Sequence, residues 1–319
     1  MLNQNSLFAL KDWLNKSIIG QPHLIDRLLI ALLADGHLLV EGAPGLAKTK
    51  AIKTLSEGLE ASFHRIQFTP DLLPSDVTGT DIYRPENGTF EFQSGPIFHN
   101  LVLADEINRA PAKVQSSLLE AMAERQVSVG KTTYPLPELF LVMATQNPVE
   151  QEGTYPLPEA QLDRFLLHVN VDYPNAASEK KILQLARSEA KHENLEKPTP
   201  ISQEELFAAR KEVLSVHMAD SIEDYIVNLT CATRRPAAVD IDLANWVEFG
   251  VSPRGTIALD RCARANAWLN SRDYVSPEDV HAVIHDVFRH RLILSFESEA
   301  SGINTDEVID HLLELIAIA

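Results

Sequence analysis

A short apolar run near the start of the sequence leads into two glycines, a proline, a lysine and a threonine. This segment, HLLVEGAPGLAKTK, spans residues 37–50. Its spacing matches the phosphate-binding pattern G-x-x-x-x-G-K-[ST] except at Ala47, where the pattern has glycine. In such a loop, backbone N–H groups at a helix N-terminus surround phosphate oxygens. Lys48 would then reach the β- and γ-phosphates, and the Thr49 hydroxyl would be a ligand of Mg²⁺.

The alanine at position 47 raises the question whether this segment binds a nucleotide or is an ordinary strand-to-helix turn. We expect Ala47 to adopt helical dihedral angles, because it lies where the following helix would begin. Its methyl group should then cost little, and the loop should function. The residues that would contact the nucleotide are Gly42, Ala43, Pro44, Gly45, Leu46, Ala47, Lys48, Thr49 and Lys50.

Two adjacent carboxylates follow another apolar run. The segment LVLADE ends with Asp105 and Glu106, at the predicted end of a strand. A nucleotide hydrolase needs such groups beside the phosphate loop: Asp105 would hold Mg²⁺ through water, and Glu106 would activate the attacking water. An acidic pair at a strand end is otherwise a solvated edge. Because a phosphate-loop pattern precedes this pair, the sequence favours a site for ATP and Mg²⁺.

Strands and helices alternate in the part of the chain that carries these residues. Apolar runs predict buried strands, and apolar residues spaced three and four apart predict helices. The expected strands are 37–42, 62–68, 100–106, 138–148 and 164–171, and the expected helices are 22–34, 46–59 and 113–125. Such alternation predicts an α/β fold with a parallel five-stranded sheet and helices on both faces.

After residue 174 the alternation stops, and nearly every segment has helical spacing. Helices are expected at 176–190, 202–214, 220–232, 256–269, 277–289 and 305–318. The sequence therefore predicts two domains, an ATP-binding α/β domain over residues 1–174 and an all-helical domain over 175–319. Residues 70–98 and 126–137 interrupt the α/β pattern, and each is expected to contain a hairpin, the first with a turn at Asn87-Gly88.

Four motifs resemble those of the AAA+ ATPases and, within them, of the MoxR family. They are GAPGLAKT, DEINRAP, ATQNPVEQEGTYPLPEAQLDRF and GVSPRG, in this order along the chain. The resemblance covers residues 15–319 and includes the alanine of the phosphate-loop pattern. It implies that the helical domain is the lid of an AAA+ fold. It also implies a working ATP site, in which Ile19 and Gly20 pack against adenine.

The resemblance assigns roles to three further polar residues. Asn147 resembles the sensor-1 residue, which lies beside the γ-phosphate and orients the attacking water; an Asn-Pro turn is the structural alternative. Arg164 resembles the arginine finger, which reaches the γ-phosphate of a neighbouring subunit; a surface pair with Asp163 is the alternative. Arg254 resembles the sensor-2 arginine, which ties the helical lid to the nucleotide.

The two interruptions of the α/β pattern also resemble elements of related AAA+ rings. Residues 70–98 resemble the helix-2 insert, and residues 126–137 resemble the hairpin before sensor 1. In related rings these elements point into the pore and contact the substrate. Ordinary surface loops are the alternative, since proteins tolerate such loops readily.

The resemblance implies a homo-hexameric ring that hydrolyses ATP, with Mg²⁺, to remodel or mature protein partners in a chaperone-like role. Members of the family are typically linked to proteins with a von Willebrand factor A domain. A nucleotide-gated scaffold or switch with little turnover is one alternative function. An ATPase subunit similar to that of magnesium chelatase is another, and a DNA-directed motor is a third.

Composition and charge limit the classes of partner. The net charge of −17 argues against a general nucleic-acid binder, which needs clustered Lys and Arg to neutralise phosphates. The first residues lack the features of a signal peptide, and the apolar runs are too short to span a membrane. Cys231 and Cys262 are too few for a disulfide framework. We therefore expect a cytoplasmic protein that binds no nucleic acid and does not insert into a membrane.

Overall fold

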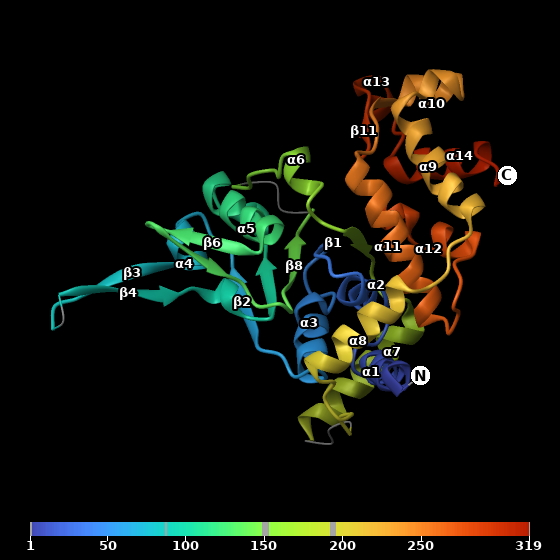
Figure 1. The fold of residues 1–319 in the computed structure, drawn as a ribbon. Coiled ribbons are helices and arrows are strands. Elements are labelled where there is room, and N and C mark those ends of the chain that lie inside the picture. Colours follow the sequence, from blue (N-terminus) through green and yellow to red (C-terminus); the bar gives the residue numbers. More distant parts are fainter. Residues whose placement is uncertain (1, 87, 149–152, 192–195, 319) are drawn as a thin grey trace.

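The computed structural model describes residues 2–86, 88–148, 153–191 and 196–318. Five parallel strands form the central sheet, in the order β2-β5-β8-β1-β9 (Figure 1). Their bounds are β1 Leu38–Gly42, β2 Phe63–Gln67, β5 Leu101–Asp105, β8 Leu141–Gln146 and β9 Leu167–Val171. The predicted α/β class and the five strands of the sheet are confirmed.

Helices cover both faces of the sheet, as parallel pairing requires. The helices on one face are α1 (Leu2–Ser17), α2 (Pro22–Leu33) and α3 (Lys48–Glu57), and those on the other are α4 (Pro74–Thr78) and α5 (Ala112–Glu124). Side chains alternate between the faces along each strand, so Leu38 and Val40 join one core while Leu39 joins the other. Because both faces are buried in the middle of the sheet, β1, β5 and β8 appear in the sequence as largely apolar runs, whereas the edge strands β2 and β9 contain polar residues.

The register of the sheet aligns the carboxyl ends of neighbouring strands. Glu41 on β1 pairs with Gln146 on β8, and β5 pairs with β8 up to Ala104. On the edge strand β2, Gln67 pairs with Asp105 at the end of β5. The loops that leave β1, β5 and β8 therefore start side by side at one edge, which is where ligands bind in open α/β sheets.

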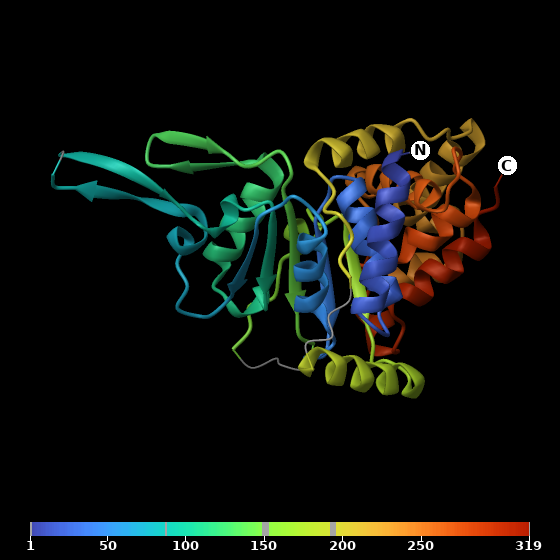
Figure 2. The ribbon, with the colours of Figure 1, turned by 90° about the horizontal axis from the view of Figure 1, so that it is seen from below.

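Two antiparallel hairpins project from the α/β part on one side of the molecule (Figure 2). They are formed by β3 (Gly79–Arg84) with β4 (Thr89–Ser94), and by β6 (Gln126–Val129) with β7 (Thr132–Pro135). Both match the predicted hairpins, although the turn residue Asn87 lies outside the described residues. The rings of Phe92 and Tyr134 stack with 3.9 Å between their centroids, so the two hairpins support each other.

The C-terminal part is mainly helical, as expected. Its helices are α7 (Ala176–Ala190), α8 (Gln203–Leu214), α9 (Asp220–Arg234), α10 (Ile241–Trp246), α11 (Pro253–Leu269), α12 (Pro277–Phe288), α13 (Phe296–Ala300) and α14 (Thr305–Leu315). A short antiparallel pair, β10 (Val247–Phe249) with β11 (Ile293–Leu294), is an addition that the spacing did not predict, because such short strands show no alternation. Among the helices of the described ranges, none has the length and the apolar character needed to cross a bilayer.

Helix α1 and several short elements lie outside the predicted set. The short elements are the helices α4, α6 (Glu159–Leu162), α10 and α13 and the 3₁₀ turns η1 (Pro96–Phe98), η2 (Ile107–Arg109) and η3 (Pro236–Ala238). A signal for α1 exists in the sequence, since Leu7, Leu10 and Leu14 have helical spacing and are buried in the core.

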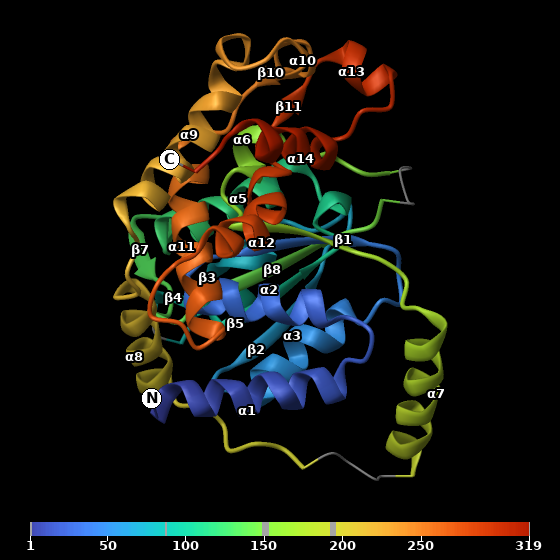
Figure 3. The same cartoon turned by 90° about the vertical axis from the view of Figure 1, so that its right-hand side faces the viewer.

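One hydrophobic core is shared by the two parts of the chain. Leu28 of α2, Leu206 of α8, Leu259 of α11 and Ile284 of α12 all belong to it and are fully buried. The two parts therefore meet at residue 174 in the sequence, but they share one hydrophobic core in the structure. Helix α7 differs: described along its whole length, it buries no residue and lies apart from the other C-terminal helices (Figure 3).

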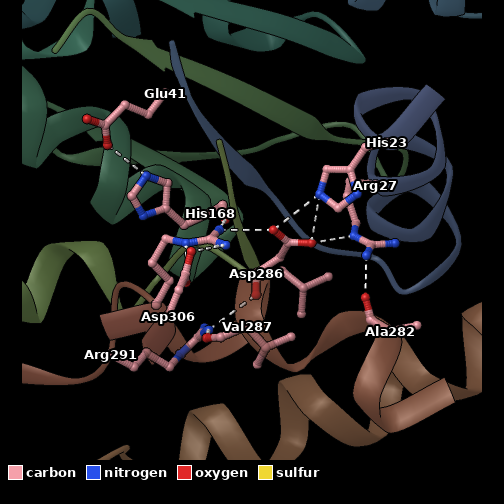
Figure 4. A network of polar contacts seen from close by, with 11 residues as sticks. His23, Arg27, Glu41, His168, Ala282, Asp286, Val287, Arg291 and Asp306 are labelled. Atoms are coloured by element: carbon pink, nitrogen blue, oxygen red, sulfur yellow. Dashed lines mark hydrogen bonds and ion pairs between the residues drawn. The ribbon is translucent and has the colours of Figure 1, made fainter. Parts of the chain in front are cut away.

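A buried ion-pair network fastens α12 to the α/β part (Figure 4). The Asp286 side chain is 3% exposed, and its Oδ2 accepts a hydrogen bond from Arg27 Nε of α2 at 2.5 Å. His23 Nε2 lies 3.1 Å from the same oxygen, and Arg289 Nη1 donates to Oδ1 at 3.0 Å. Arg27 also donates to the carbonyl oxygen of Ala282. One carboxylate therefore compensates two largely buried guanidinium groups.

The network continues to the strand that precedes the glycine-containing loop. Arg289 donates to the backbone carbonyl of His168 on β9 at 2.6 Å and to both carboxylate oxygens of Asp306. The His168 ring in turn lies 3.0 Å from the carboxylate of Glu41, one residue before Gly42 (Figure 4). Contacts from a C-terminal helix thus reach the base of the loop.

Asp286 should be a major determinant of stability. Burial alone would raise the pKa of Asp286, but a hydrogen bond from His23 and the charge of Arg27 hold it well below its ordinary value. Asp286→Ala would leave the buried Arg27 without its carboxylate and Arg289 with Asp306 alone, so the free energy of unfolding should fall by about 3–5 kcal/mol. Urea denaturation measures this change. Asp310→Ala, which removes an exposed ion-pair partner on α14, should change it by less than about 1 kcal/mol.

The sign of the pH dependence follows from the same pKa shift. A carboxylate whose pKa is lower in the folded than in the unfolded protein stabilises the fold above its unfolded pKa of about 4. This stabilisation is lost as the pH falls through the folded pKa. The stability difference between wild type and Asp286→Ala should therefore be large near neutral pH and should shrink in strong acid. A difference that stays constant over this range would contradict the role of the Asp286 charge.

Candidate active site

A polar cavity of about 420 Å³ lies at the carboxyl edge of the sheet. The loop between β1 and α3 forms one wall, and the ends of β5 and β8 form another. The lining residues are Pro44, Gly45, Leu46, Ala47, Lys48, Thr49, Lys50, Arg65, Asp105, Glu106, Thr145, Gln146 and Asn147. The structure therefore brings residues 44–50 of the predicted phosphate loop, the acidic pair and Asn147 to one cavity, whereas the predicted Gly42 and Ala43 are not among its lining residues.

Lys48 is the first residue of α3, and its side chain reaches back to the ends of two strands. Its ammonium group donates hydrogen bonds to the carbonyl oxygens of Gly42 and Gln146, the latter at 3.4 Å. Burial lowers the pKa of Lys48, while the charges of Asp105 and Glu106 act in the opposite direction. The ammonium group is thus held between β1 and β8, at the helix N-terminus that would face phosphate oxygens.

Ala47 has φ 58° and ψ 15°, which lie in the left-handed region. The expectation of helical dihedral angles at this residue is therefore wrong. The left-handed region suits glycine and costs an alanine about 1–2 kcal/mol, because Cβ approaches the following carbonyl oxygen. Gly45 is also left-handed, with φ +84°, and a Cβ there would meet no atom within 4 Å. Backbone conformation, rather than space for a side chain, is what the loop requires at these positions.

Asp105 ends β5 with both carboxylate oxygens hydrogen-bonded. Thr145 on β8 donates its hydroxyl hydrogen to Oδ1 at 2.6 Å. Arg65 on β2 donates to Oδ2 from Nη2 at 2.6 Å and from Nε at 3.0 Å. Donors from both adjacent strands therefore hold Asp105 at the edge of the cavity.

Glu106 follows with φ 57°, another left-handed residue. Its backbone N–H donates to the Thr145 hydroxyl oxygen at 2.9 Å, so one threonine holds both acidic residues. Its Oε2 accepts a hydrogen bond from Gln67 Nε2 at 2.9 Å and lies 2.9 Å from Arg109 Nε. These two contacts orient the carboxylate through its Oε2 atom.

The donor groups in the polar cavity fit a Mg²⁺ ion. The Thr49 hydroxyl and the Asp105 carboxylate are hard oxygen donors that line the same cavity. Mg²⁺ keeps several of its waters and binds proteins through one or two such groups together with substrate phosphates. The predicted pair of ligands is therefore present, and a bound ion would have to compete with Arg65 for Asp105.

A second, more apolar cavity of about 260 Å³ adjoins the loop. It shares residues 44–47 and Lys50 with the polar cavity. Its apolar lining includes Ile18, Ile19, Tyr173, Ile182 and Leu185. Gly20, with φ +86°, packs so closely that a Cβ would lie 2.9 Å from Pro174 Cβ. An apolar slot beside a phosphate loop suits a nucleotide base, and the family resemblance places adenine here.

Four residues that contact the acidic pair are missing from the sequence prediction: Arg65, Gln67, Arg109 and Thr145. The sequence carries a partial signal for Arg65 and Gln67, because residues two apart on a strand point to the same face of the sheet. Their position beside Asp105 follows only from the strand order, which places β2 next to β5. Thr145 is two residues before Asn147 on the same strand, and its role likewise depends on the neighbouring strand.

Arg164 and Arg254 line a different cavity, of about 360 Å³, between α5 and α11. Arg125, Arg261 and Arg291 line it too. The cavity is therefore strongly basic and suits an anionic group.

Asp163 does not pair with Arg164. Its Oδ1 accepts a hydrogen bond from Arg291 Nε at 2.8 Å, and its Oδ2 accepts one from Ser252 Oγ at 2.9 Å. Arg164 Nε is buried and has no hydrogen-bond partner among the residues that the structure describes. The alternative of a surface pair between Asp163 and Arg164 is therefore excluded.

The structure corrects the expected position of Arg254. The prediction has this arginine tie the helical lid to the nucleotide, but the side chain does not line the cavity of the phosphate loop. Ser252, the N-cap residue of α11, is bonded to Asp163, and this contact places Arg254 beside Arg164. Both arginines therefore belong to one surface, away from the loop of their own chain.

Ala47→Gly tests the strain in the loop. Glycine removes the left-handed strain, which offsets the greater freedom of glycine in the unfolded chain, so stability should be unchanged or rise by about 1 kcal/mol. Ala177→Gly, on the exposed surface of α7, is the matched control and should lower stability by about 0.5–1 kcal/mol. Urea denaturation compares the two variants. An equal loss of stability in both would contradict strain at Ala47.

Two protein-family models match the chain. The model of the ATPase family associated with various cellular activities (AAA) matches residues 37–167, and that of the AAA lid domain matches residues 243–312. A crystal structure of a protein from Cytophaga hutchinsonii superposes with a TM-score of 0.92. It is 47% identical in sequence, and the match covers 100% of this chain and 96% of that chain.

Curated relatives narrow the family. Chaperone MoxR1 of Mycobacterium tuberculosis is 44% identical over 99% of this chain and 82% of its own length. Protein MoxR of Methylorubrum extorquens is 34% identical over 88% of this chain and 85% of its own length. The magnesium-chelatase subunit ChlI-2 of Arabidopsis thaliana is a distant relative, 28% identical over 65% of this chain and 47% of its own length. With the loop, the acidic pair and the lid placed in this fold, the chain belongs to the MoxR family of AAA+ ATPases.

Proposed function

We propose that the chain is one subunit of a homo-hexameric ring that hydrolyses ATP with Mg²⁺ and couples hydrolysis to the remodelling of protein partners. The separation of the phosphate-loop cavity from the arginine cavity carries this proposal. Lys48, Asp105 and Glu106 line the first cavity, and Arg164 and Arg254 line the second. A head-to-tail contact between identical copies would join one cavity to the other and, when repeated, would close a ring.

Each group of the joined site has a distinct task. The N–H groups at the start of α3 and the Lys48 ammonium group bind phosphate oxygens. The predicted metal ligands hold Mg²⁺, which neutralises phosphate charge when it is bound. Glu106 accepts a proton from the attacking water, and Asn147 orients that water. Arg164 of one copy offers a planar, permanently charged group to the γ-phosphate held by its neighbour.

Protein rather than nucleic acid is the proposed substrate. The segment 70–98 has five acidic residues and one basic residue, and Tyr83 and Phe90 are exposed near the end of its hairpin. Acidic side chains repel a phosphate backbone, whereas aromatic side chains are typical of protein contacts. A relative named as a chaperone supports a remodelling role. We also propose a cytoplasmic location, and the family resemblance adds a partner with a von Willebrand factor A domain.

A nucleotide-gated switch or scaffold with little turnover is the second candidate function. The contacts of Glu106 with Gln67 and Arg109 favour it, because both donors contact Oε2 and restrain the carboxylate that would have to reach the attacking water. In a remodelling ATPase, a partner that disturbs these contacts would raise hydrolysis. In a switch, the rate of phosphate release would stay low even when a partner is present.

Lys48→Ala and Glu106→Gln should separate nucleotide binding from hydrolysis. Lys48→Ala removes the ammonium group at the phosphates and should weaken ATP binding by about tenfold or more. Glu106→Gln keeps the side-chain volume but cannot accept a proton, so binding should persist and hydrolysis should fall by about a hundredfold or more. Titration with labelled ATP and steady-state phosphate release measure the two effects. Full turnover by Glu106→Gln would remove Glu106 from its proposed role.

Mixed rings test whether the arginines act on a neighbour. Arg164→Ala should bind ATP but lose most hydrolysis, because its phosphate loop is intact and its arginine is missing. A mixture with Lys48→Ala should regain activity, since about a quarter of the interfaces would join an intact loop to an intact arginine. Arg254→Ala should behave in the same way, given its position beside Arg164. Phosphate release is measured at several mixing ratios, after subunit exchange is shown with a fluorescent label.

Two outcomes of these measurements count against the ring. No recovery at any ratio, with exchange demonstrated, would mean that the arginines act within their own chain or only on its structure. Mass photometry with and without ATP gives an independent test, in which ATP should make the hexamer more complete. A monomer at micromolar concentration with ATP would contradict the ring and favour the switch.

A further inference from the structure

Arg65 holds a place beside the predicted metal ligand that the proposed hydrolysis does not use. Its guanidinium group donates to Oδ2 of Asp105 from Nη2 at 2.6 Å and from Nε at 3.0 Å. Oδ1 of the same carboxylate accepts the hydroxyl hydrogen of Thr145 at 2.6 Å. Both oxygens of Asp105 therefore already have donors. Oδ2 accepts two of these hydrogen bonds, so a divalent ion that uses Oδ2 has to take the place of Arg65.

The two donors differ in how readily they can leave. Thr145 is 1% exposed, and its hydroxyl oxygen also accepts the backbone N–H of Glu106 at 2.9 Å. Moving this side chain would break two hydrogen bonds beside the buried sheet. Arg65 lies on the edge strand β2, and its long, flexible side chain is 50% exposed. Arg65 is therefore the donor that can yield.

We propose that Arg65 competes with Mg²⁺ for the Asp105 carboxylate. The guanidinium group holds Oδ2, and an ion that arrives with the nucleotide takes over this oxygen and displaces Arg65. The displacement is electrostatic as well as steric, because a guanidinium group and a divalent cation repel each other at one carboxylate. This inference rests on the proposed function, and it makes Arg65 a positioning residue of the metal site rather than a catalytic residue.

The displacement of Arg65 reaches the second carboxylate through Gln67. Arg65 Nη2 also donates to Gln67 Oε1 at 2.6 Å, and Gln67 Nε2 donates to Glu106 Oε2 at 2.9 Å. Arg65 thus fixes the amide group that holds Glu106. When Arg65 leaves Asp105, Gln67 loses this hydrogen bond and becomes a less rigid donor to Glu106. Metal binding and the release of the proposed base are coupled through two side chains on one face of β2.

The test is a Mg²⁺ titration of nucleotide binding by the full-length protein, with a fluorescent ATP analogue that is not hydrolysed. Affinity is measured with EDTA and then at rising Mg²⁺, which gives the half-saturating Mg²⁺ concentration. Arg65→Gln removes the competing charge, so this concentration should fall about fivefold or more relative to wild type. Arg65→Lys keeps the charge with a single donor group, so its half-saturating Mg²⁺ concentration should lie between those of wild type and Arg65→Gln.

Arg84→Gln is the matched control. Arg84 is also about half exposed and has an ion pair of its own, with Glu91 at 2.8 Å, but it lies on the projecting hairpin β3–β4. The half-saturating Mg²⁺ concentration of Arg84→Gln should equal that of wild type. Gln67→Met should shift this concentration much less than Arg65→Gln does, because Gln67 makes no bond to the Asp105 carboxylate among those found in the described residues.

Several results would overturn the proposal. They are an unchanged or higher half-saturating concentration in Arg65→Gln, an equal shift in Arg84→Gln or Gln67→Met, and nucleotide binding that does not respond to Mg²⁺ in any variant. Failure of the wild type to bind nucleotide at every Mg²⁺ concentration would instead refute the proposed function. Melting temperatures in EDTA show whether each variant is folded, and Arg65→Lys decides the matter if Arg65→Gln is unfolded.

Discussion

The hydroxyl group of Thr145 is hydrogen-bonded to both acidic residues at the edge of the sheet. It donates to Asp105 at 2.6 Å and accepts the N–H of Glu106 at 2.9 Å. These bonds exist because β8 lies between β1 and β5, and because the parallel register ends the three strands close to one level. The same register brings Asn147 and the loop after Gly42 to the acidic pair. Without this register, the polar groups of the site would lie at strand ends that do not meet.

The C-terminal helices are packed onto the α/β part through a shared core, and this packing decides where the arginines lie. Helices α11 and α12 share that core with α2, and Asp286 adds a buried clamp between α12 and α2. Arg254 is thereby placed beside Arg164 rather than over the loop. Helix α7 is the exception, because it borders the apolar cavity and is tied to α3 by Lys50 and Glu189 at 2.7 Å. In the proposed ring, α7 would respond to the nucleotide of its own chain and the arginines to that of a neighbour.

In the polar cavity, the contacts that compensate the charges of the two acidic residues also restrain their side chains. Two adjacent carboxylates repel each other, and cations beside them offset this repulsion. Arg65 contacts Asp105 and Arg109 contacts Glu106, so each acid has its own cation. Each of these contacts also occupies an oxygen that the proposed chemistry needs. The contacts that balance the charge of the acids therefore also restrain their side chains.

Much of this fold and site follows from local sequence patterns. Apolar runs, helical spacing and the glycine-containing turn predict the five strands, the helices between them and the loop that carries Lys48. Asp105 and Glu106 are recognised because they directly follow an apolar run. These features depend on residues close together in the chain, where the periodicity of side chains and the chemistry of turns act directly.

Three features were decided by the tertiary structure. Ala47 is left-handed because the backbone must pass from β1 into α3 with its N–H groups toward the cavity, and the methyl group of an alanine does not prevent this. Arg65 meets Asp105 because β2 pairs with β5, and Arg254 lines the same cavity as Arg164 because Ser252 at the start of α11 is bonded to Asp163. Strand order and helix packing are set by burying apolar surface from distant segments, and no local pattern in the sequence records which distant segments will meet.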